Sequence, residues 1–146
     1  MKDLRGLGGM AATVQEVRDV ENRLGLRLPD QLVEVLTQAP LGGLTFTLSE
    51  DEDPSGLGVD MRWMTPKQIV EEGTETYPGI SAVSADYLPI GIDLTGGGDP
   101  YFVRLDDLAL VRIPHDAIRG DALVMEAVEL VALSLDAFID HATAGR

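Results

Sequence analysis

The sequence predicts an α+β domain in which helices pack against a mostly antiparallel sheet. Three observations indicate this fold class: two amphipathic helical segments near the start, a run of alternating strand patterns through the middle, and a final helical segment. Segregation of helices from a run of strands is typical of α+β domains, whereas parallel α/β folds alternate helix with strand. We therefore expect antiparallel strands joined by turns and covered by helices.

Two helical segments open the predicted domain. Thr13 followed by Glu16 forms the pattern of a capping box, in which each residue bonds the other's backbone N–H. Gly25 supplies the left-handed residue that commonly ends a helix, and Pro29 keeps the residue before it extended and starts a second helix. Apolar residues recur at helical spacing in both segments: Val14, Val17, Val20 and Leu24, then Leu32, Val35, Leu36 and Ala39.

The middle of the chain alternates apolar and polar residues, as half-buried strands do. A short helix with Thr65 as its cap is expected to run to about Glu72, and residues 73–86 are expected to be irregular. Ser134 is the expected cap of the last helix. The expected strands are residues 44–48, 59–63, 88–92, 101–105, 109–113 and 128–132.

Length and composition predict one domain. The chain has 146 residues, 45% of them hydrophobic, and we expect a flexible N-terminal arm over residues 1–12 before a single domain over residues 13–146. It contains no cysteine, which excludes disulfides and thiolate metal sites. No stretch has the pattern of a signal peptide or the length of a membrane span, so we expect a cytoplasmic protein.

The net charge of the chain restricts the classes of molecule that it can bind. The chain has 11 Lys and Arg against 25 Asp and Glu, a net charge of -14. A surface of this sign repels nucleic acid and acidic membranes, and it attracts a basic protein. The acidity has a second interpretation, in which it only keeps the protein in solution.

The order of several short motifs resembles the SUKH superfamily, which includes a yeast cell-wall synthesis regulator and many bacterial toxin-immunity proteins. The resemblance covers residues 13–141. It implies a non-enzymatic binding module, whose bacterial members neutralise a cognate toxin, often a nuclease, by occluding its active site. The alternative is a general scaffold or regulatory adaptor of the same fold. The matching residues are Glu21, Leu24-Gly25, Leu28-Pro29, Leu36, Leu88-Pro89-Ile90-Gly91, Gly97-Gly98-Asp99, Tyr101-Phe102, Ala132, Ser134 and Phe138-Ile139.

An acidic loop is the main candidate for binding a partner. Glu50, Asp51, Glu52 and Asp53 place four carboxylates on a polar segment that is not expected to pack, where they could mimic phosphates toward a basic toxin cleft. A merely solvated loop is the competing interpretation. A calcium loop is a third, although the spacing lacks the glycine and distal glutamate of an EF-hand.

Three further aspartates complete the predicted partner-binding set. Asp99 follows the glycine-rich turn Gly96-Gly97-Gly98, where its carboxylate either caps the turn or faces a partner. Asp106 and Asp107 form the next tight turn and would extend an acidic binding edge.

No pattern of an enzyme, cofactor site or metal site is present in the sequence. The glycine-rich turn lacks the following Gly-Lys-Ser/Thr of a phosphate loop, and no serine lies in a Gly-x-Ser-x-Gly elbow. His115 and His141 are not at ligand spacing. We therefore predict no catalytic, cofactor-binding or metal-binding residues. Trp63 is interpreted either as core or as a partner anchor.

Overall fold

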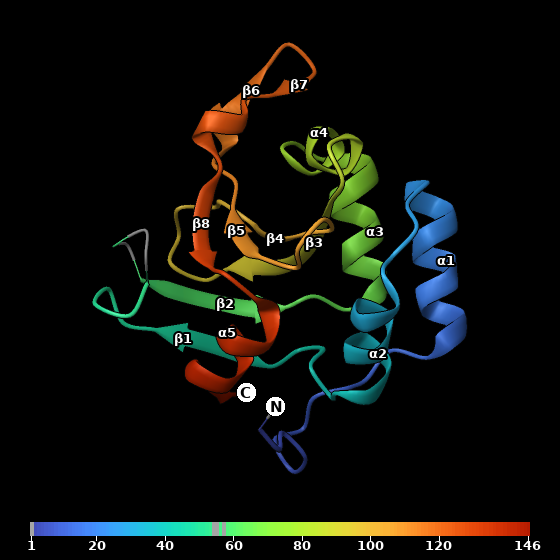
Figure 1. Ribbon diagram of the computed structural model, residues 1–146, viewed down its shortest axis with the longest axis vertical. Helices are drawn as coiled ribbons and strands as arrows, with labels where there is room; N and C mark the ends of the chain where they lie inside the picture. The colour runs from blue at the N-terminus through green and yellow to red at the C-terminus, as the bar shows by residue number, and fades with distance from the viewer. Residues whose placement is uncertain (1, 54–55, 57) are drawn as a thin grey trace.

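The protein is a seven-stranded antiparallel sheet curled into a half-barrel, with five helices packed around it in the described residues (Figure 1). This computed structural model describes residues 2–53, 56 and 58–146. The predicted α+β class is confirmed. Within these ranges, no helix combines the length and the apolar character that crossing a bilayer requires.

The sheet has the strand order β8-β5-β4-β3-β2-β1-β9, and every neighbouring pair is antiparallel. A small separate hairpin, β6 with β7, lies beyond β5. The strands are β1 Thr45–Leu48, β2 Val59–Trp63, β3 Tyr87–Asp93, β4 Tyr101–Arg104, β5 Leu110–Arg112, β6 Ile118–Arg119, β7 Ala122–Leu123, β8 Glu129–Ala132 and β9 Thr143–Gly145.

The helices fall into two groups. In Figure 1, α1 to α4 stand together to one side of the sheet, and α5 lies in front of β1 and β2. The ring of Phe138 on α5 is 5.8 Å from that of Phe46 on β1, so α5 packs directly on the sheet. The helices are α1 Val14–Leu24, α2 Asp30–Gln38, α3 Pro66–Glu75, α4 Gly79–Ser84 and α5 Leu135–His141, with short 3-10 turns at His115–Ala117 and Met125–Ala127.

The predicted capping residues of α1 and α5 are confirmed. Thr13 and Glu16 form the capping box of α1, and Gly25 ends that helix in the left-handed region with φ 66°. The Ser134 hydroxyl accepts a hydrogen bond from the Ala137 N–H and begins α5. Each cap satisfies backbone groups that a helix end leaves without intrahelical partners.

The core occupies both faces of the sheet. The larger cluster joins the helices to the inner face and includes Phe46, Trp63 and Phe138. A smaller cluster on the other face contains Tyr87 and Phe102. Trp63 is only 2% exposed, which confirms the core interpretation. Because β3 to β5 are covered on both faces, their residues form continuous buried runs instead of alternating.

Parts of the expected fold differ in the structure. The segment expected as a flexible arm makes specific contacts: Leu4 is buried, Met10 pairs with Gly42, and the Ala12 N–H bonds the Leu36 carbonyl. Its boundary at residue 12 stays a prediction. Val14 was expected on the buried helix face and is instead exposed.

Several described elements were not expected, among them α4, β9 and the small hairpin of β6 and β7. Residues 73–86 are not irregular, because α3 continues to Glu75 and α4 follows it. At the C-terminal end, β9 pairs with β1 and extends the sheet by one strand.

Candidate partner-binding surface

Antiparallel topology decides which carboxylates lie together. β1 and β3 run toward the same end of the sheet, β5 ends there, and β8 begins there. The loops after β1 and β3 therefore lie at that end, whereas the turn after β4 lies at the opposite end. We call this region the acidic end and define it by Glu50, Asp51, Glu52, Asp53, Asp93, Asp99 and Glu129.

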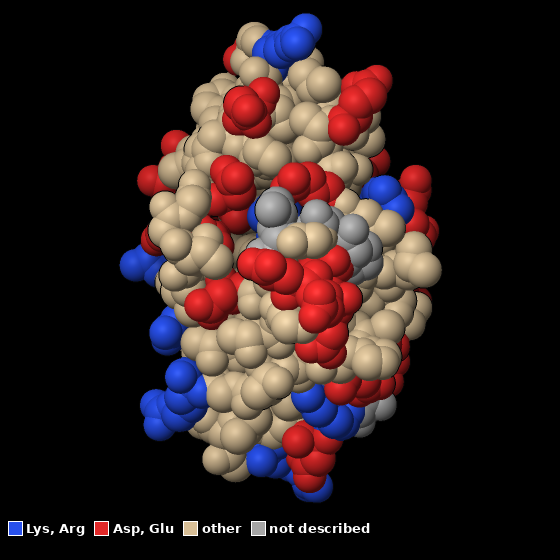
Figure 2. Space-filling view, turned by 90° about the vertical axis from the view of Figure 1, so that its left-hand side faces the viewer, with Lys and Arg blue, Asp and Glu red and all other residues tan. Residues whose placement is uncertain are grey.

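The predicted partner-binding residues are consequently divided between two regions. The loop carboxylates and Asp99 lie at the acidic end, and Asp106 and Asp107 lie in the turn between β4 and β5, at the other end of the hairpin. In Figure 2, Asp and Glu side chains gather around the loop between β1 and β2. Glu50, Asp51 and Glu52 are exposed, which makes the loop available to a partner.

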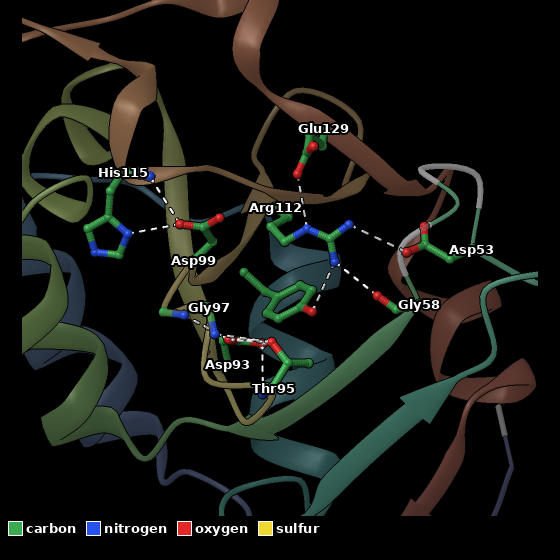
Figure 3. A network of polar contacts seen from close by, with 11 residues as sticks. Asp53, Gly58, Asp93, Thr95, Gly97, Asp99, Arg112, His115 and Glu129 are labelled. Atoms are coloured by element: carbon green, nitrogen blue, oxygen red, sulfur yellow. Dashed lines mark hydrogen bonds and ion pairs between the residues drawn. The ribbon is translucent and has the colours of Figure 1, made fainter.

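Arg112 is the buried cation that organises the acidic end (Figure 3). Its guanidinium lies 3.0 Å from Glu129, 3.5 Å from Asp53 and 3.1 Å from the Tyr101 hydroxyl. It also donates to the Gly58 carbonyl at 3.0 Å. These contacts tie the loop between β1 and β2 to β4, β5 and β8.

The expectation that the acidic loop does not pack is wrong for Asp53. Its side chain is fully buried against Arg112, which is itself 7% exposed in its side chain. Burial alone would lower the pKa of Arg112, but the hydrogen bonds that its guanidinium donates to Glu129 and Tyr101 outweigh burial and raise that pKa. The loop is therefore anchored at Asp53, while the three carboxylates before it point to solvent.

Tyr101 reaches Arg112 because a glycine opposite leaves room for it. Gly91 pairs with Tyr101 across β3 and β4, and a Cβ there would lie 2.8 Å from the Met61 sulfur and 3.0 Å from the Tyr101 Cβ. The Arg112 guanidinium carbon lies 5.5 Å from the centroid of the Tyr101 ring, within the range of a cation–π contact. Burial raises the pKa of the Tyr101 hydroxyl, so it stays protonated and can donate a hydrogen bond.

Asp93 shapes the loop between β3 and β4. Its carboxylate accepts hydrogen bonds from the Thr95 hydroxyl at 2.8 Å and from the Gly98 N–H at 2.9 Å. Partial burial would raise the pKa of Asp93, but these hydrogen bonds stabilise the carboxylate and lower it. Asp93 is thus occupied in holding the turn.

Asp99 connects the same loop to the segment after β5. Its Oδ1 accepts the backbone N–H of His115 at 3.1 Å and lies 2.9 Å from the ring Nδ1 of His115 (Figure 3). Asp99 therefore has a structural role, but its carboxylate bonds the segment after β5, and Asp93 holds the glycine-rich turn. The Asp99 side chain is 33% exposed, so part of it remains accessible.

At the opposite end, Asp107 forms an ion pair with Arg104. The two side chains are joined at 2.7 Å and 3.0 Å, and Asp107 also accepts the Ala109 N–H. The hydrogen bond from Arg104 lowers the pKa of Asp107. Asp106 is exposed beside this pair.

The arrangement suits electrostatic docking. The three exposed carboxylates of the loop precede Asp53, whose ion pair with Arg112 holds the loop to the sheet. In the part of the chain that the structure describes, no three His, Asp or Glu side chains are grouped as metal ligands would be.

Sequence reasoning did not find Arg112, Asp93 or Glu129. The available signal for Arg112 was a charged residue inside the apolar run Leu110-Val111-Arg112-Ile113, because a buried arginine requires an acidic partner.

Comparison with known proteins agrees with the resemblance in the sequence. Residues 11–141 match the SMI1 / KNR4 family (SUKH-1). No curated protein matches the chain. The family is generally non-catalytic, includes toxin-immunity and regulatory proteins, and its members typically bind protein toxins. With the match extending from α1 to the end of α5, the chain belongs to the SMI1 / KNR4 (SUKH-1) family.

Proposed function

We propose that this protein is a non-enzymatic immunity protein, which binds a cognate bacterial polymorphic toxin and neutralises it by occluding its active site. Membership of a family that includes immunity proteins carries the proposal. The exposed carboxylates of the acidic end support it, because they fit a basic surface on the toxin. A nuclease is a suitable toxin, since a cleft that holds a polyanionic substrate is itself basic.

The exposed loop carboxylates are expected to act mainly on the rate of association. Glu50, Asp51 and Glu52 lie at the surface, where charges steer a diffusing partner but are screened by salt over about 8–10 Å at physiological ionic strength. A basic toxin should therefore associate quickly at low salt and more slowly as salt is added. Dissociation should depend less on these residues, because each remains largely solvated.

The test is co-expression with the toxin encoded beside this gene, followed by binding kinetics with a catalytically inactive form of that toxin. We expect growth to be rescued and a complex to form. The triple variant Glu50→Gln, Asp51→Asn and Glu52→Gln should lower the association rate constant about tenfold at low salt, with a smaller effect at high salt.

A matched control removes the same charge elsewhere. Asp19, Glu71 and Glu75 are exposed on α1 and α3, on the helical side of the molecule. Changing these three to amides alters the net charge equally and should leave the association rate within about twofold, because steering depends mainly on charges near the contact. Absence of both rescue and complex would overturn the proposal. A complex formed only with a cellular protein that is not a toxin would instead support an adaptor role.

A further inference from the structure

An apolar hollow lies beside the acidic loop, where the half-barrel fails to close. Its volume is about 420 Å³, and its walls come from β1, the loop after β1, β8, α5 and the segment between β8 and α5. Val131 and Phe138 are each 1% exposed, so buried core side chains underlie the hollow. Leu133 is 78% exposed, the largest exposed fraction among the large apolar side chains described.

The position of the hollow follows from the topology. β8 and β9 are the two edge strands of the sheet, and a half-barrel leaves a gap between its edges. The side chains of Leu135, Phe138 and Ile139 on α5 fill the interior of that gap. Ala137 lies on the hollow side of α5, and its small side chain leaves the space above Phe138 open.

The charges around the hollow indicate the kind of side chain that it can bind. Glu52 lines the hollow, and Glu50 and Asp51 precede it on the exposed loop. Among the described lining residues there is no lysine or arginine, and the only other titratable side chain is His141. A second copy of this chain would bring another net charge of -14 to the same place, and an anionic lipid surface would be repelled as well. An apolar side chain flanked by Lys or Arg fits both the apolar residues that line the hollow and the carboxylates of the loop beside it.

We infer that this hollow receives one apolar side chain of the toxin, from a segment in which Lys or Arg residues flank it. The inference rests on the proposed function and adds a specific anchor to it. Binding energy concentrates where an apolar side chain fills a desolvated pocket, and the surrounding polar rim contributes mainly to steering and water exclusion. The hollow therefore governs dissociation of the complex, while the acidic loop governs association.

The first experiment measures both rate constants with the inactive toxin encoded by the adjacent gene. Leu133→Asp replaces the exposed apolar side chain at the edge of the hollow with a carboxylate, and Ala137→Trp fills the hollow. We expect each variant to raise the dissociation rate constant at least about tenfold, the effect of losing one interface anchor, with the association rate within about threefold of wild type.

Val14→Asp is the matched control. Val14 is also apolar and 54% exposed, and it begins α1 on the far side of the molecule from the hollow, so this variant adds the same charge without touching it. Urea unfolding of all three variants checks the fold, and Leu133→Asp carries the result if Ala137→Trp proves unstable, because Leu133 lies at the surface.

The second experiment identifies the chemistry of the occupant. Because the chain contains no cysteine, Leu133→Cys provides a unique attachment point for a photoactivated cross-linker. Mass spectrometry of the complex should locate the cross-link on a toxin segment that holds an apolar residue next to Lys or Arg. Cross-linking to an acidic segment, or none in a complex that forms normally, would overturn the inference.

The outcomes separate the inference from the proposed function. If the wild-type protein forms the complex and both hollow variants dissociate like Val14→Asp, the hollow has no part in binding and the proposed function stands. If the wild-type protein forms no complex with the toxin, the proposed function fails and the inference fails with it.

Discussion

Replacing Arg112 with methionine tests the idea that a buried ion-pair network fixes the acidic end. Methionine replaces the aliphatic part of the arginine side chain but removes the guanidinium that contacts Asp53, Glu129 and Tyr101. Removing one partner of a buried ion pair costs about 3–5 kcal/mol, because the remaining charge stays buried without its counter-ion. A domain of this size is stable by about 5–15 kcal/mol, so the variant should still fold at 25 °C.

The two acidic partners contribute unequally, and the structure predicts the difference. The Asp53 side chain is 0% exposed, so most of the loss should come from its interaction with Arg112. Glu129 is 33% exposed, and Glu129→Gln should therefore cost only about 1 kcal/mol or less. The double variant Arg112→Met and Asp53→Asn should recover part of the loss, with a coupling energy of about 1–3 kcal/mol.

Urea unfolding followed by tryptophan fluorescence measures these differences. Trp63 is the single tryptophan and is 2% exposed, so its emission reports exposure of the core. A loss below about 1 kcal/mol for Arg112→Met at an unchanged m-value would refute the reasoning, because it would mean that Asp53 is adequately solvated without the arginine. Equal losses for Arg112→Met and Glu129→Gln would refute the ranking of the two partners.

Two further substitutions test local features of the fold. Thr13→Ala removes the side-chain half of the α1 capping box and should cost about 1 kcal/mol in urea unfolding, whereas Thr13→Ser should cost much less; equal losses would contradict the capping role. Asp93→Asn should cost about 1–2 kcal/mol at pH 7, because the amide accepts the bonds from Thr95 and Gly98 less strongly. The pKa of Asp93 is lowered in the folded state, so its contribution is present above the unfolded value near 3.8 and is lost as the pH falls through the folded value. The difference between Asp93→Asn and wild type should consequently shrink below about pH 4, and a difference that stays constant or grows there would contradict the assignment.

The parts of the fold that depend on local chemistry were predictable from the sequence. The capping residues Thr13 and Ser134 placed the starts of α1 and α5, and period-two alternation located β1 and β2. The parts that depend on tertiary contacts could not be predicted from the sequence. α4 begins at Gly79, within a Pro78-Gly79 pair that locally indicates a turn. The Gly79 N–H bonds the Glu72 carboxylate, and a Cβ at Gly79 would meet the Glu72 carbonyl.

The acidic end likewise has features that the sequence predicts and features that it does not. A run of carboxylates is visible in any sequence, so the exposed loop could be predicted. The pairing of Asp53 with Arg112 could not, because 59 positions separate the two residues and only the sheet brings them together. Strand direction, however, already determines that Asp99 and Asp106 flank β4 at opposite ends, so the division of the predicted set follows from antiparallel order once the hairpin is recognised.

In the loop between β1 and β2, different carboxylates are expected to contribute to stability and to binding. Asp53 is buried and paired with Arg112, whereas Glu50, Asp51 and Glu52 are exposed like charges, with Glu52 accepting a hydrogen bond from the Ser49 hydroxyl. Changing these three to amides should therefore leave the unfolding free energy unchanged or raise it slightly, because a net charge of -14 already opposes the compact state. The same triple variant should slow association with a basic toxin. Urea unfolding and association kinetics on this one variant thus test opposite expectations, and a variant that lost stability would show that these carboxylates hold the loop together instead of presenting a charged face.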